Sequence, residues 1–335
     1  MNWWQATILG IVQGLTEFIP VSSSGHLILS REFLGLGYGD FLWFDLLLHI
    51  ATLLAIGLVF YKDIIKIFKL PFRIAGLIII ACIPAVIAGF FLSPLIRNVF
   101  YYSATYLWAF FLVTAILLLV SEMYEKRQSP KMFILDNFNA AKRLFSKRRR
   151  EADRAVVSTN NSANDRGCWQ AAKAVKHSEA LVECSNRADG THKDKKQDEP
   201  FLPDIKLKHA LAMGLMQAVA VFPGISRSGS TIFGGVMSRG KRKSVAKFSF
   251  LMSIPIVLGA VLFDIVDIMG DSVPAAAAIP WYSYALGFLF SFVVGFFAIK
   301  FMIRLISKAD FKWFALYMFG LSILTFVMFF LPAVR

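Results

Sequence analysis

Cysteine is scarce in this chain, and its N-terminus lacks basic residues. The 335 residues include three cysteines, Cys82, Cys168 and Cys184, with no Cys-x-x-Cys spacing and no even-numbered framework. This pattern excludes a disulfide scaffold and a cysteine-based zinc site. The first 25 residues contain no Lys or Arg. A cleavable signal peptide begins with a basic region, so we expect none here.

Charge is missing from long stretches of the sequence. Hydrophobic residues make up 57% of the chain, which contains 33 phenylalanines, whereas a soluble domain is about 45–50% apolar. Roughly 18 apolar residues in a helix cross about 30 Å of hydrocarbon. The clear candidates are residues 46–61, 74–92, 102–120, 248–263, 282–298 and 314–331. We therefore predict an all-α polytopic integral membrane protein with six transmembrane helices.

Acidic residues are fewer than basic ones, and the formal net charge is +14. The basic residues cluster at the ends of apolar stretches, in residues 62–73, 239–247 and 300–312, whereas the loop 264–271 carries only acids. This distribution follows the positive-inside rule. It predicts cytoplasmic basic clusters, an external acidic loop and contacts with membrane lipids, and no nucleic-acid partner.

Residues 126–204 interrupt the apolar pattern. Between Lys126 and Arg150 there are nine basic residues and one acid, Asp136, which predicts a cytoplasmic location. The composition cannot bury a hydrophobic core. We interpret this segment as a disordered basic insertion. Binding of lipid headgroups or of a partner is the alternative.

An internal repeat relates the two halves of the chain. An offset of 204 residues aligns Gly10, Gln13, Ser22, Ser24 and Gly25 with Gly214, Gln217, Ser226, Ser228 and Gly229. Three predicted crossings separate the two copies, and an odd number reverses the membrane sense of the second. We therefore predict inverted-topology repeats, residues 1–125 and 205–335.

Each repeat begins with a polar interruption, EFIPVSSSGHL (17–27) and VFPGISRSGSTIF (221–233). The flanking apolar segments are too short to cross a bilayer. Residues 2–35 and 206–238 would each form a re-entrant pair of short helices. Such broken helices are tolerated at membrane depth where they line an enclosed cavity. Hairpins that enter from opposite faces would bring their tips together in one site.

Serines precede the second predicted helix of each hairpin. A single serine at a helix start is typically an N-cap, and that is the alternative interpretation of each one. Two helix N-termini that converge on one cavity form an anion site. Gly25 and Gly224 would let the backbone approach the ligand closely.

Arg227 indicates an anionic ligand. An arginine inside a membrane domain costs at least ~2.5 kcal/mol, and its guanidinium matches phosphate or carboxylate oxygens. A neutralising pair with Glu17 is the alternative. Glu17 and His26 add acid–base capacity beside the serines. The set indicates acyl or phosphoryl transfer through an activated serine, or metal-assisted attack by water.

The segments QGLTEFIPVSSSGH (13–26) and PGISRSGST (223–231) closely resemble the two signature motifs of the undecaprenyl-diphosphate phosphatase family, the bacitracin-resistance type called BacA or UppP. The resemblance covers both halves, residues 1–125 and 205–335. It implies six spanning helices and two re-entrant pairs in the bacterial inner membrane. The implied reaction hydrolyses the polyprenyl diphosphate to its monophosphate and phosphate, in a cavity open to the periplasm, and recycles the lipid carrier for peptidoglycan synthesis.

The resemblance also assigns site residues. Glu17 matches the catalytic glutamate, Ser23 the proposed nucleophile, His26 the motif histidine and Arg227 the diphosphate-binding arginine. Gln13 stands where the family has Glu or Gln. The resemblance implies that Glu17 and Gln13 hold a divalent cation, Mg²⁺ or Ca²⁺. A glutamine at position 13 supplies one carboxylate fewer than a glutamate would. The other residues expected at the diphosphate are Ser22, Ser24, Gly25, Gly224, Ser226, Ser228 and Thr231.

Inverted repeats with broken helices are also the plan of transporters. A flippase for polyprenyl phosphate, or a transporter of another anion, is therefore the alternative function. The presence of Glu17, Ser23 and His26 favours hydrolysis, because carrying an anion requires no nucleophile and no base. The sequence leaves open whether serine or water attacks phosphorus and whether the chain forms a homodimer.

Overall fold

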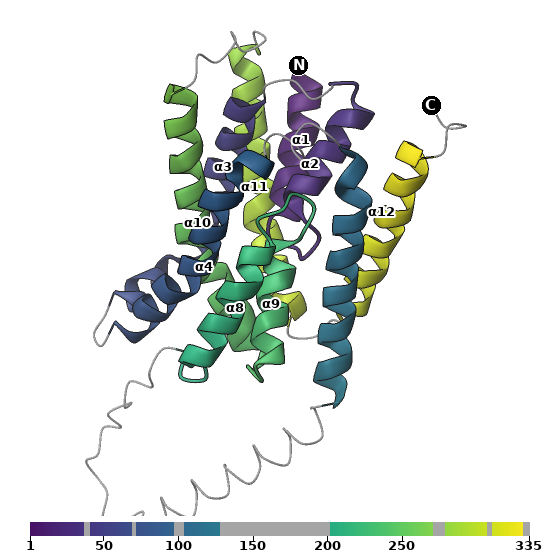
Figure 1. Cartoon of the computed structure of the whole chain (residues 1–335). Coiled ribbons are helices and arrows are strands. Elements are labelled where there is room, and N and C mark those ends of the chain that lie inside the picture. Colours follow the sequence, from purple (N-terminus) through teal and green to yellow (C-terminus); the bar gives the residue numbers. More distant parts are fainter. Residues whose placement is uncertain are drawn as a thin grey trace, which may run out of the picture. The chain divides into compact units, whose positions relative to one another are not determined.

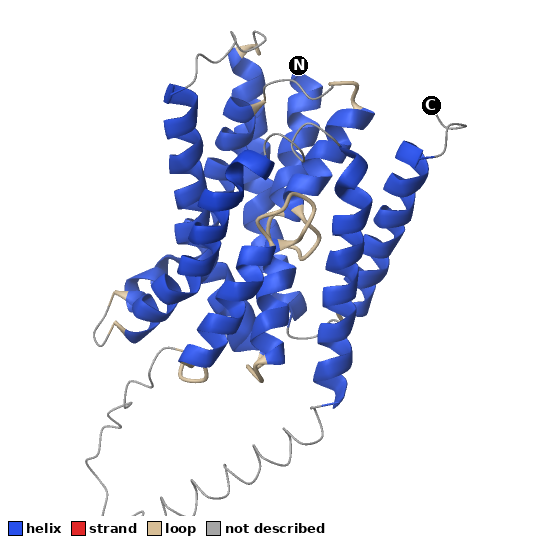
Figure 2. Cartoon of the chain, viewed as in Figure 1, coloured by secondary structure: helices blue, strands red, loops and turns tan. Residues whose placement is uncertain are grey.

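The computed structural model describes residues 1–36, 41–68, 72–96, 104–127, 202–270, 279–306 and 310–330. All regular structure in these ranges is helical (Figure 2). The chain divides into two compact units, one of Met1–Glu125 with Phe201–Arg335 and one of Lys126–Pro200. The predicted disordered insertion, residues 126–204, lies almost wholly outside the described residues.

The described residues contain six helices that are long and apolar enough to cross a membrane, which confirms the predicted number. They are α3 (Leu42–Ile67), α4 (Arg73–Leu95), the span Ala104–Arg127 that opens with η2 (Ala104–Tyr106), α10 (Arg242–Gly270), α11 (Trp281–Ile306) and α12 (Lys312–Phe330). Several helices extend beyond the predicted boundaries because their ends carry polar residues.

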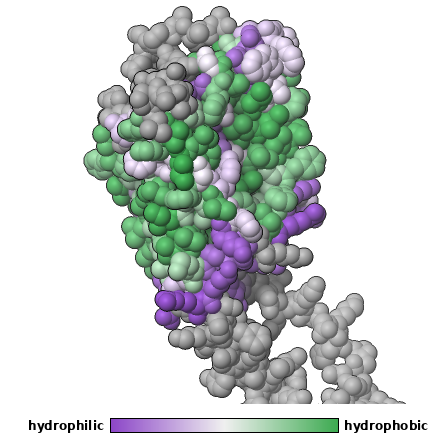
Figure 3. Space-filling view, turned by 90° about the vertical axis from the view of Figure 1, so that its right-hand side faces the viewer, coloured by the Kyte–Doolittle hydropathy of each residue, from purple (hydrophilic) through white to green (hydrophobic). Residues whose placement is uncertain are grey.

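The outward faces of these helices are apolar. Phe90 and Phe91 in α4 are 68% and 74% exposed, and Trp281 and Trp313, at the starts of α11 and α12, are 80% and 65% exposed. Figure 3 shows hydrophobic residues over much of one face, with hydrophilic residues gathered toward its lower end. A continuous apolar surface of this kind suits lipid, and tryptophan at helix ends suits the membrane–water interface.

Two pairs of short helices complete the first unit. They are α1 (Trp3–Thr16) with α2 (Ser23–Phe33), and α8 (Leu207–Val219) with α9 (Arg227–Met237). The longest, α1, has 14 residues and measures about 21 Å, less than the hydrocarbon thickness. In Figure 1, α1 and α2 lie in the upper part and α8 and α9 in the lower part, and the loop of each pair faces the centre.

The two pairs pack in equivalent ways. α1 runs along α11, and α8 runs along α4. A Cβ atom at Gly10 would lie 2.5 Å from the carbonyl oxygen of Gly287, and one at Gly214 would lie 2.4 Å from that of Ala81. Small residues let membrane helices approach this closely. The two glycines that the sequence repeat aligns therefore perform the same packing task.

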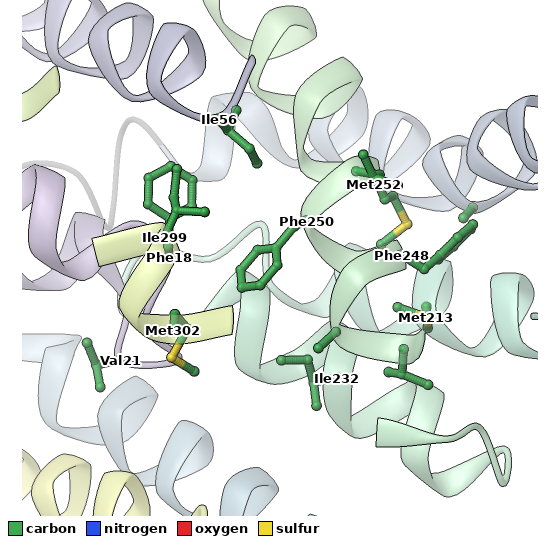
Figure 4. Packing of buried hydrophobic residues seen from close by; sticks show 14 of the residues in the cluster. Phe18, Val21, Ile56, Met213, Ile232, Phe248, Phe250, Met252, Ile299 and Met302 are labelled. Carbon is green, nitrogen blue, oxygen red and sulfur yellow. The ribbon is translucent and has the colours of Figure 1, made fainter. Parts of the chain in front are cut away.

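A hydrophobic core surrounds the turn between α1 and α2. Phe18, which follows Glu17, packs edge-on against Phe250 of α10 with 6.4 Å between ring centroids. Phe60 of α3 contacts the same ring at 6.0 Å. Figure 4 shows Phe18 and Phe250 among Ile56, Ile299 and Met302. This packing fixes the turn that carries Glu17.

The basic clusters meet at one end of the helices. Lys247 at the start of α10 pairs with Asp63 near the end of α3 at 2.8 Å, and Arg242 pairs with Glu125 at 3.2 Å. Both pairs are partly buried and join helices that lie far apart in the sequence. The predicted basic clusters 62–73 and 239–247 lie together, as the positive-inside rule requires.

Candidate active site

Glu17 lies at the end of the first short helix. α1 ends at Thr16, and the backbone N–H of Glu17 still donates to the carbonyl of Gln13 at 3.0 Å. Pro20 lacks a backbone donor for the next helical hydrogen bond, which favours the end of the helix here. Glu17 and Gln13 therefore share one face of the last helical turn.

The second helix begins directly at the predicted nucleophile. Ser22 is the N-cap of α2, and its hydroxyl accepts from the N–H of Gly25 at 3.4 Å. The φ angle of Ser22 is 66°, a conformation that non-glycine residues seldom adopt and that is common at functional sites. Ser23 follows as the first helical residue.

A threonine from a spanning helix fixes the second loop. Gly224 has a φ of 100°, and Ser226 caps α9 by accepting from the N–H of Gly229 at 3.1 Å. The hydroxyl of Thr114, in the span Ala104–Arg127, accepts from the N–H of Ser226 at 3.0 Å and lies 3.4 Å from the carbonyl of Gly224. This arrangement orients Arg227, the first residue of α9.

The tips of the two pairs are in direct contact. The hydroxyl of Ser24 accepts from the N–H of Gly224 at 3.4 Å, and Ser228 donates to the carbonyl of Ile19 at 3.3 Å. A Cβ atom at Gly25 would lie 3.1 Å from the Cα of Gly224. Loops more than 190 residues apart in sequence thus build one centre, as the motifs predict.

Glu17 joins both halves of this centre. One carboxylate oxygen pairs with the Arg227 guanidinium. The other accepts from the Ser23 hydroxyl at 2.6 Å and from the Gln13 amide at 3.0 Å. The Glu17 side chain is 2% exposed and that of Arg227 is 23% exposed. The ion pair of Glu17 with Arg227, predicted from the sequence as the alternative to an anion site, is therefore present. The same carboxylate also contacts Ser23.

Two opposing effects act on the Glu17 carboxyl. Burial raises its pKa, but the positive charge of Arg227, with the Ser23 hydrogen bond, outweighs burial and holds the pKa below its ordinary value. A nearby opposite charge favours the ionised form. Glu17 is therefore a carboxylate at neutral pH and can accept a proton.

Gln13 and Glu17, the residues that the resemblance assigns to a divalent cation, lie side by side, and the Gln13 amide N–H donates to Glu17 at 3.0 Å. Within the described part of the chain no group of three or more His, Cys, Asp or Glu side chains could hold a metal. However, the buried Gln13 Oε1 has no hydrogen-bond partner among those residues. Magnesium takes oxygen ligands and is commonly held by one or two carboxylates plus substrate phosphates.

His26 contacts a different set of residues. Its Nδ1 lies 2.7 Å from the carbonyl oxygen of Ser22, and its Nε2 lies 2.8 Å from the hydroxyl of Tyr317 in α12. Burial lowers the pKa of His26, so the imidazole is neutral near pH 7. The Ser23 hydroxyl donates to Glu17 and not to this ring.

Serines of α10 border the site and were not predicted from the sequence. Ser249 and Ser253 line a cavity of about 10 Å³ together with Glu17, Arg227 and Ser228, which is close to the space for one water. The two serines are four positions apart, so one face of α10 carries both. The i, i+4 spacing of these serines in the sequence could have indicated a polar face of α10 toward the site.

Three other positions complete the comparison with the predicted site. Thr231, which the resemblance assigns to the diphosphate, has its hydroxyl 2.6 Å from that of Ser249 and donates to the carbonyl of Arg227 at 3.0 Å. It therefore supports the α9 turn. Thr114 and Tyr317 were missed, because nothing in the sequence distinguishes them from other polar residues in apolar spans.

Fold and site together define a multi-pass helical membrane protein with a serine, a carboxylate and an arginine at its polar centre. The chain belongs to the bacitracin resistance protein BacA family, whose model matches residues 6–151 and 180–324. The unmatched residues between these ranges lie inside the segment predicted as an insertion.

Curated relatives align with nearly the whole chain. Undecaprenyl-diphosphatase 3 of Bacillus cereus is 31% identical over 325 residues, which are 97% of this chain and 96% of the relative. Undecaprenyl-diphosphatase of Bacteroides thetaiotaomicron is 32% identical over 326 residues, 95% of each protein. Undecaprenyl-diphosphatase of Rubrobacter xylanophilus is 32% identical over 335 residues, 96% of each.

Proposed function

We propose that this chain hydrolyses undecaprenyl diphosphate to undecaprenyl phosphate and phosphate. The observation that carries the proposal is the contact of Ser23 with Glu17 and of Glu17 with Arg227. The relatives named undecaprenyl-diphosphatase and the family match support the same reaction. It regenerates the lipid carrier for cell-wall synthesis and gives resistance to bacitracin.

The diphosphate binds at the Arg227 end of the site. The guanidinium keeps 23% of its side-chain surface exposed while it pairs with Glu17, so it can also contact a ligand. The N-termini of α2 and α9 direct free amides and positive dipole ends toward the same anion. Arg227 then stabilises the charge that develops on the transferred phosphoryl group.

Ser23 attacks the terminal phosphorus. The bond from Ser23 Oγ to phosphorus forms while the bond from phosphorus to the bridging oxygen breaks, and the electron pair leaves on the polyprenyl phosphate. Glu17 accepts the Ser23 proton, because its oxygen lies 2.6 Å from that hydroxyl. Water then hydrolyses the phosphoserine and releases phosphate. Direct attack by water is the variant of this route that omits the phosphoserine.

Glu17 and Gln13 would hold a divalent cation, Mg²⁺ or Ca²⁺. The unpartnered Gln13 Oε1 and the Glu17 carboxylate supply its protein oxygens. Such an ion, when bound, neutralises phosphate charge. The Gln13 amide meanwhile orients Glu17 through its 3.0 Å hydrogen bond.

The two short helix pairs are re-entrant hairpins of inverted-topology repeats. Gly10 against Gly287 and Gly214 against Ala81 are equivalent contacts of the two halves, and the pairs extend toward the centre from opposite ends (Figure 1). This is the arrangement of midplane sites in inverted repeats. With the basic clusters in the cytoplasm of a bacterial inner membrane, the site opens to the periplasm.

An apolar groove accepts part of the polyprenyl chain. A groove of about 510 Å³ lies between the span Ala104–Arg127 and α12, and Leu112, Ile116, Leu316 and Phe319 are among its lining residues. Leu112 follows Phe111, whose ring lies 5.8 Å from the His26 ring at the site. An apolar hollow of this size suits a lipid chain whose headgroup is bound next to it.

Phosphate release from undecaprenyl diphosphate by the purified protein in nanodiscs tests the function. Wild type should release phosphate, and Glu17→Ala and Arg227→Ala should lose most of the activity, whereas Glu32→Gln should retain it. No release by wild type would overturn the proposal, as would equal release by both site variants. Movement of polyprenyl phosphate across liposomes without hydrolysis would establish the transporter alternative.

A further inference from the structure

The contact of Tyr317 with His26 lies outside both sequence motifs. Tyr317 is in α12, 291 residues from His26, and its hydroxyl oxygen is 2.8 Å from His26 Nε2. The two rings are stacked, with 5.7 Å between centroids and 14° between planes. Phe111 packs on the same imidazole at 5.8 Å. Side chains of two spanning helices therefore hold the ring.

The hydrogen bonds fix the protonation of this ring. A backbone carbonyl only accepts, so the 2.7 Å contact between His26 Nδ1 and the Ser22 carbonyl requires a proton on Nδ1. Burial keeps the imidazole neutral near pH 7. Nε2 then carries the lone pair and accepts from the Tyr317 hydroxyl. Both ring nitrogens are thus engaged.

The Ser22 carbonyl connects this ring to the nucleophile. Ser22 has the unusual φ of 66°, and Ser23 follows it directly. Such a backbone conformation persists when its surroundings hold it. The Nδ1–H of His26 holds the Ser22 carbonyl, and Tyr317 holds His26. Tyr317 therefore acts on the position of Ser23 through two hydrogen bonds.

We propose that Tyr317 is a positioning residue that fixes the tautomer and orientation of His26 and so keeps the Ser22 turn in the conformation that presents Ser23 to Glu17. In this arrangement His26 holds the backbone and Glu17 receives the proton. The inference rests on the proposed function, because it presupposes Ser23 as the nucleophile.

Steady-state kinetics with Tyr317→Phe give the first test. Loss of the hydroxyl removes one hydrogen bond, so kcat should fall about three- to tenfold, with KM within about twofold because substrate contacts remain. The matched control is Tyr284→Phe in α11, a tyrosine whose ring also packs against an aromatic ring, that of Phe44. It should keep kcat within about twofold. An unchanged kcat in Tyr317→Phe would overturn the proposal.

The ¹⁵N NMR signals of His26 give a readout that does not depend on catalysis. The signals of His26 are identified as those present in the wild-type spectrum and missing from the spectrum of the His26→Gln variant. Wild type near pH 7 should show Nδ1 protonated and Nε2 unprotonated, and Tyr317→Phe should shift the Nε2 signal. A proton on Nε2 in wild type, or an unshifted signal in Tyr317→Phe, would contradict the proposal even if the protein is an active phosphatase.

A pair of His26 variants separates positioning from base catalysis. Asparagine can place its amide N–H near the position of Nδ1, so His26→Asn should keep more activity than His26→Leu. Equal loss in both variants, with both folded, would contradict the role of His26 as a holder of the backbone. This comparison also applies if Tyr317→Phe does not fold.

Discussion

Arg227 pairs with Glu17 although 210 residues separate them in the sequence. Arg227 comes from the tip of the second hairpin and Glu17 from the tip of the first. Glu17 also accepts from Ser23 at 2.6 Å. The contact of Ser23, Glu17 and Arg227 thus draws on both halves of the chain, so this site depends on the meeting of the two tips.

Ser23→Ala should reduce phosphate release by about 10²–10⁴-fold, because it removes the proposed nucleophile and its hydrogen bond to Glu17. The matched control is Ser30→Ala, in the same helix and away from the tip contacts. Phosphate release in nanodiscs measures both variants, and a trapped phosphoserine in wild type identifies the covalent step. Near-normal turnover by Ser23→Ala would leave the direct attack of water as the route.

Gly25→Ala should destabilise the protein and inactivate it. The added Cβ would lie 2.4 Å from a ring carbon of Phe111 and 3.1 Å from the Gly224 backbone, and overpacking of this kind costs about 1–3 kcal/mol. A thermal unfolding assay measures the loss.

The control for this steric prediction is Gly57→Ala. A Cβ at Gly57, within α3, would meet no atom within 4 Å. Alanine also favours a helix over glycine by about 1 kcal/mol. Stability and activity should be kept in this variant. Comparable losses in the Gly25 and Gly57 variants would show that close approach of the tips is not the cause.

Removal of divalent cations should abolish phosphate release, and Mg²⁺ or Ca²⁺ should restore it. Gln13→Glu adds a carboxylate beside Glu17, so the metal concentration for half-maximal activity should fall by roughly tenfold. Gln5→Glu, a substitution in the same helix outside the site, should leave that concentration unchanged. Full activity of wild type in a chelator would refute the cation proposal.

Filling the apolar groove should select against long lipid chains. Leu316→Trp places a larger side chain in the groove. KM should therefore rise for undecaprenyl diphosphate and not for a short prenyl diphosphate. Leu324→Trp, also exposed on α12, should affect neither substrate. An equal effect on both chain lengths would show that the groove holds something other than the substrate tail.

Local sequence signals predicted much of the fold and the two segments that meet at the centre. Uncharged stretches predicted the six spans, and Pro20 with the serines predicted where α1 ends and α2 begins. The sequence repeat aligned Gly10 with Gly214, and both glycines pack closely against the backbone of another helix. These features depend on residues close in sequence or on a fixed offset, and both are visible without coordinates.

The remaining contacts join helices with no sequence relation to one another. The Tyr317 contact with His26 and the Thr114 contacts with the second loop depend on how two spanning helices pack. The proposal that Glu17 and not His26 accepts the Ser23 proton likewise needed the orientation of the imidazole. Composition and spacing do not determine such orientations.

A double-mutant cycle of Glu17→Gln and Arg227→Gln, with phosphate release as the readout, tests most directly that the two tips form one catalytic unit. Residues that act as a unit are strongly non-additive. The double variant should therefore be no more than a few-fold slower than the slower single variant. If the two losses multiply, Glu17 and Arg227 act independently and the joint site is contradicted.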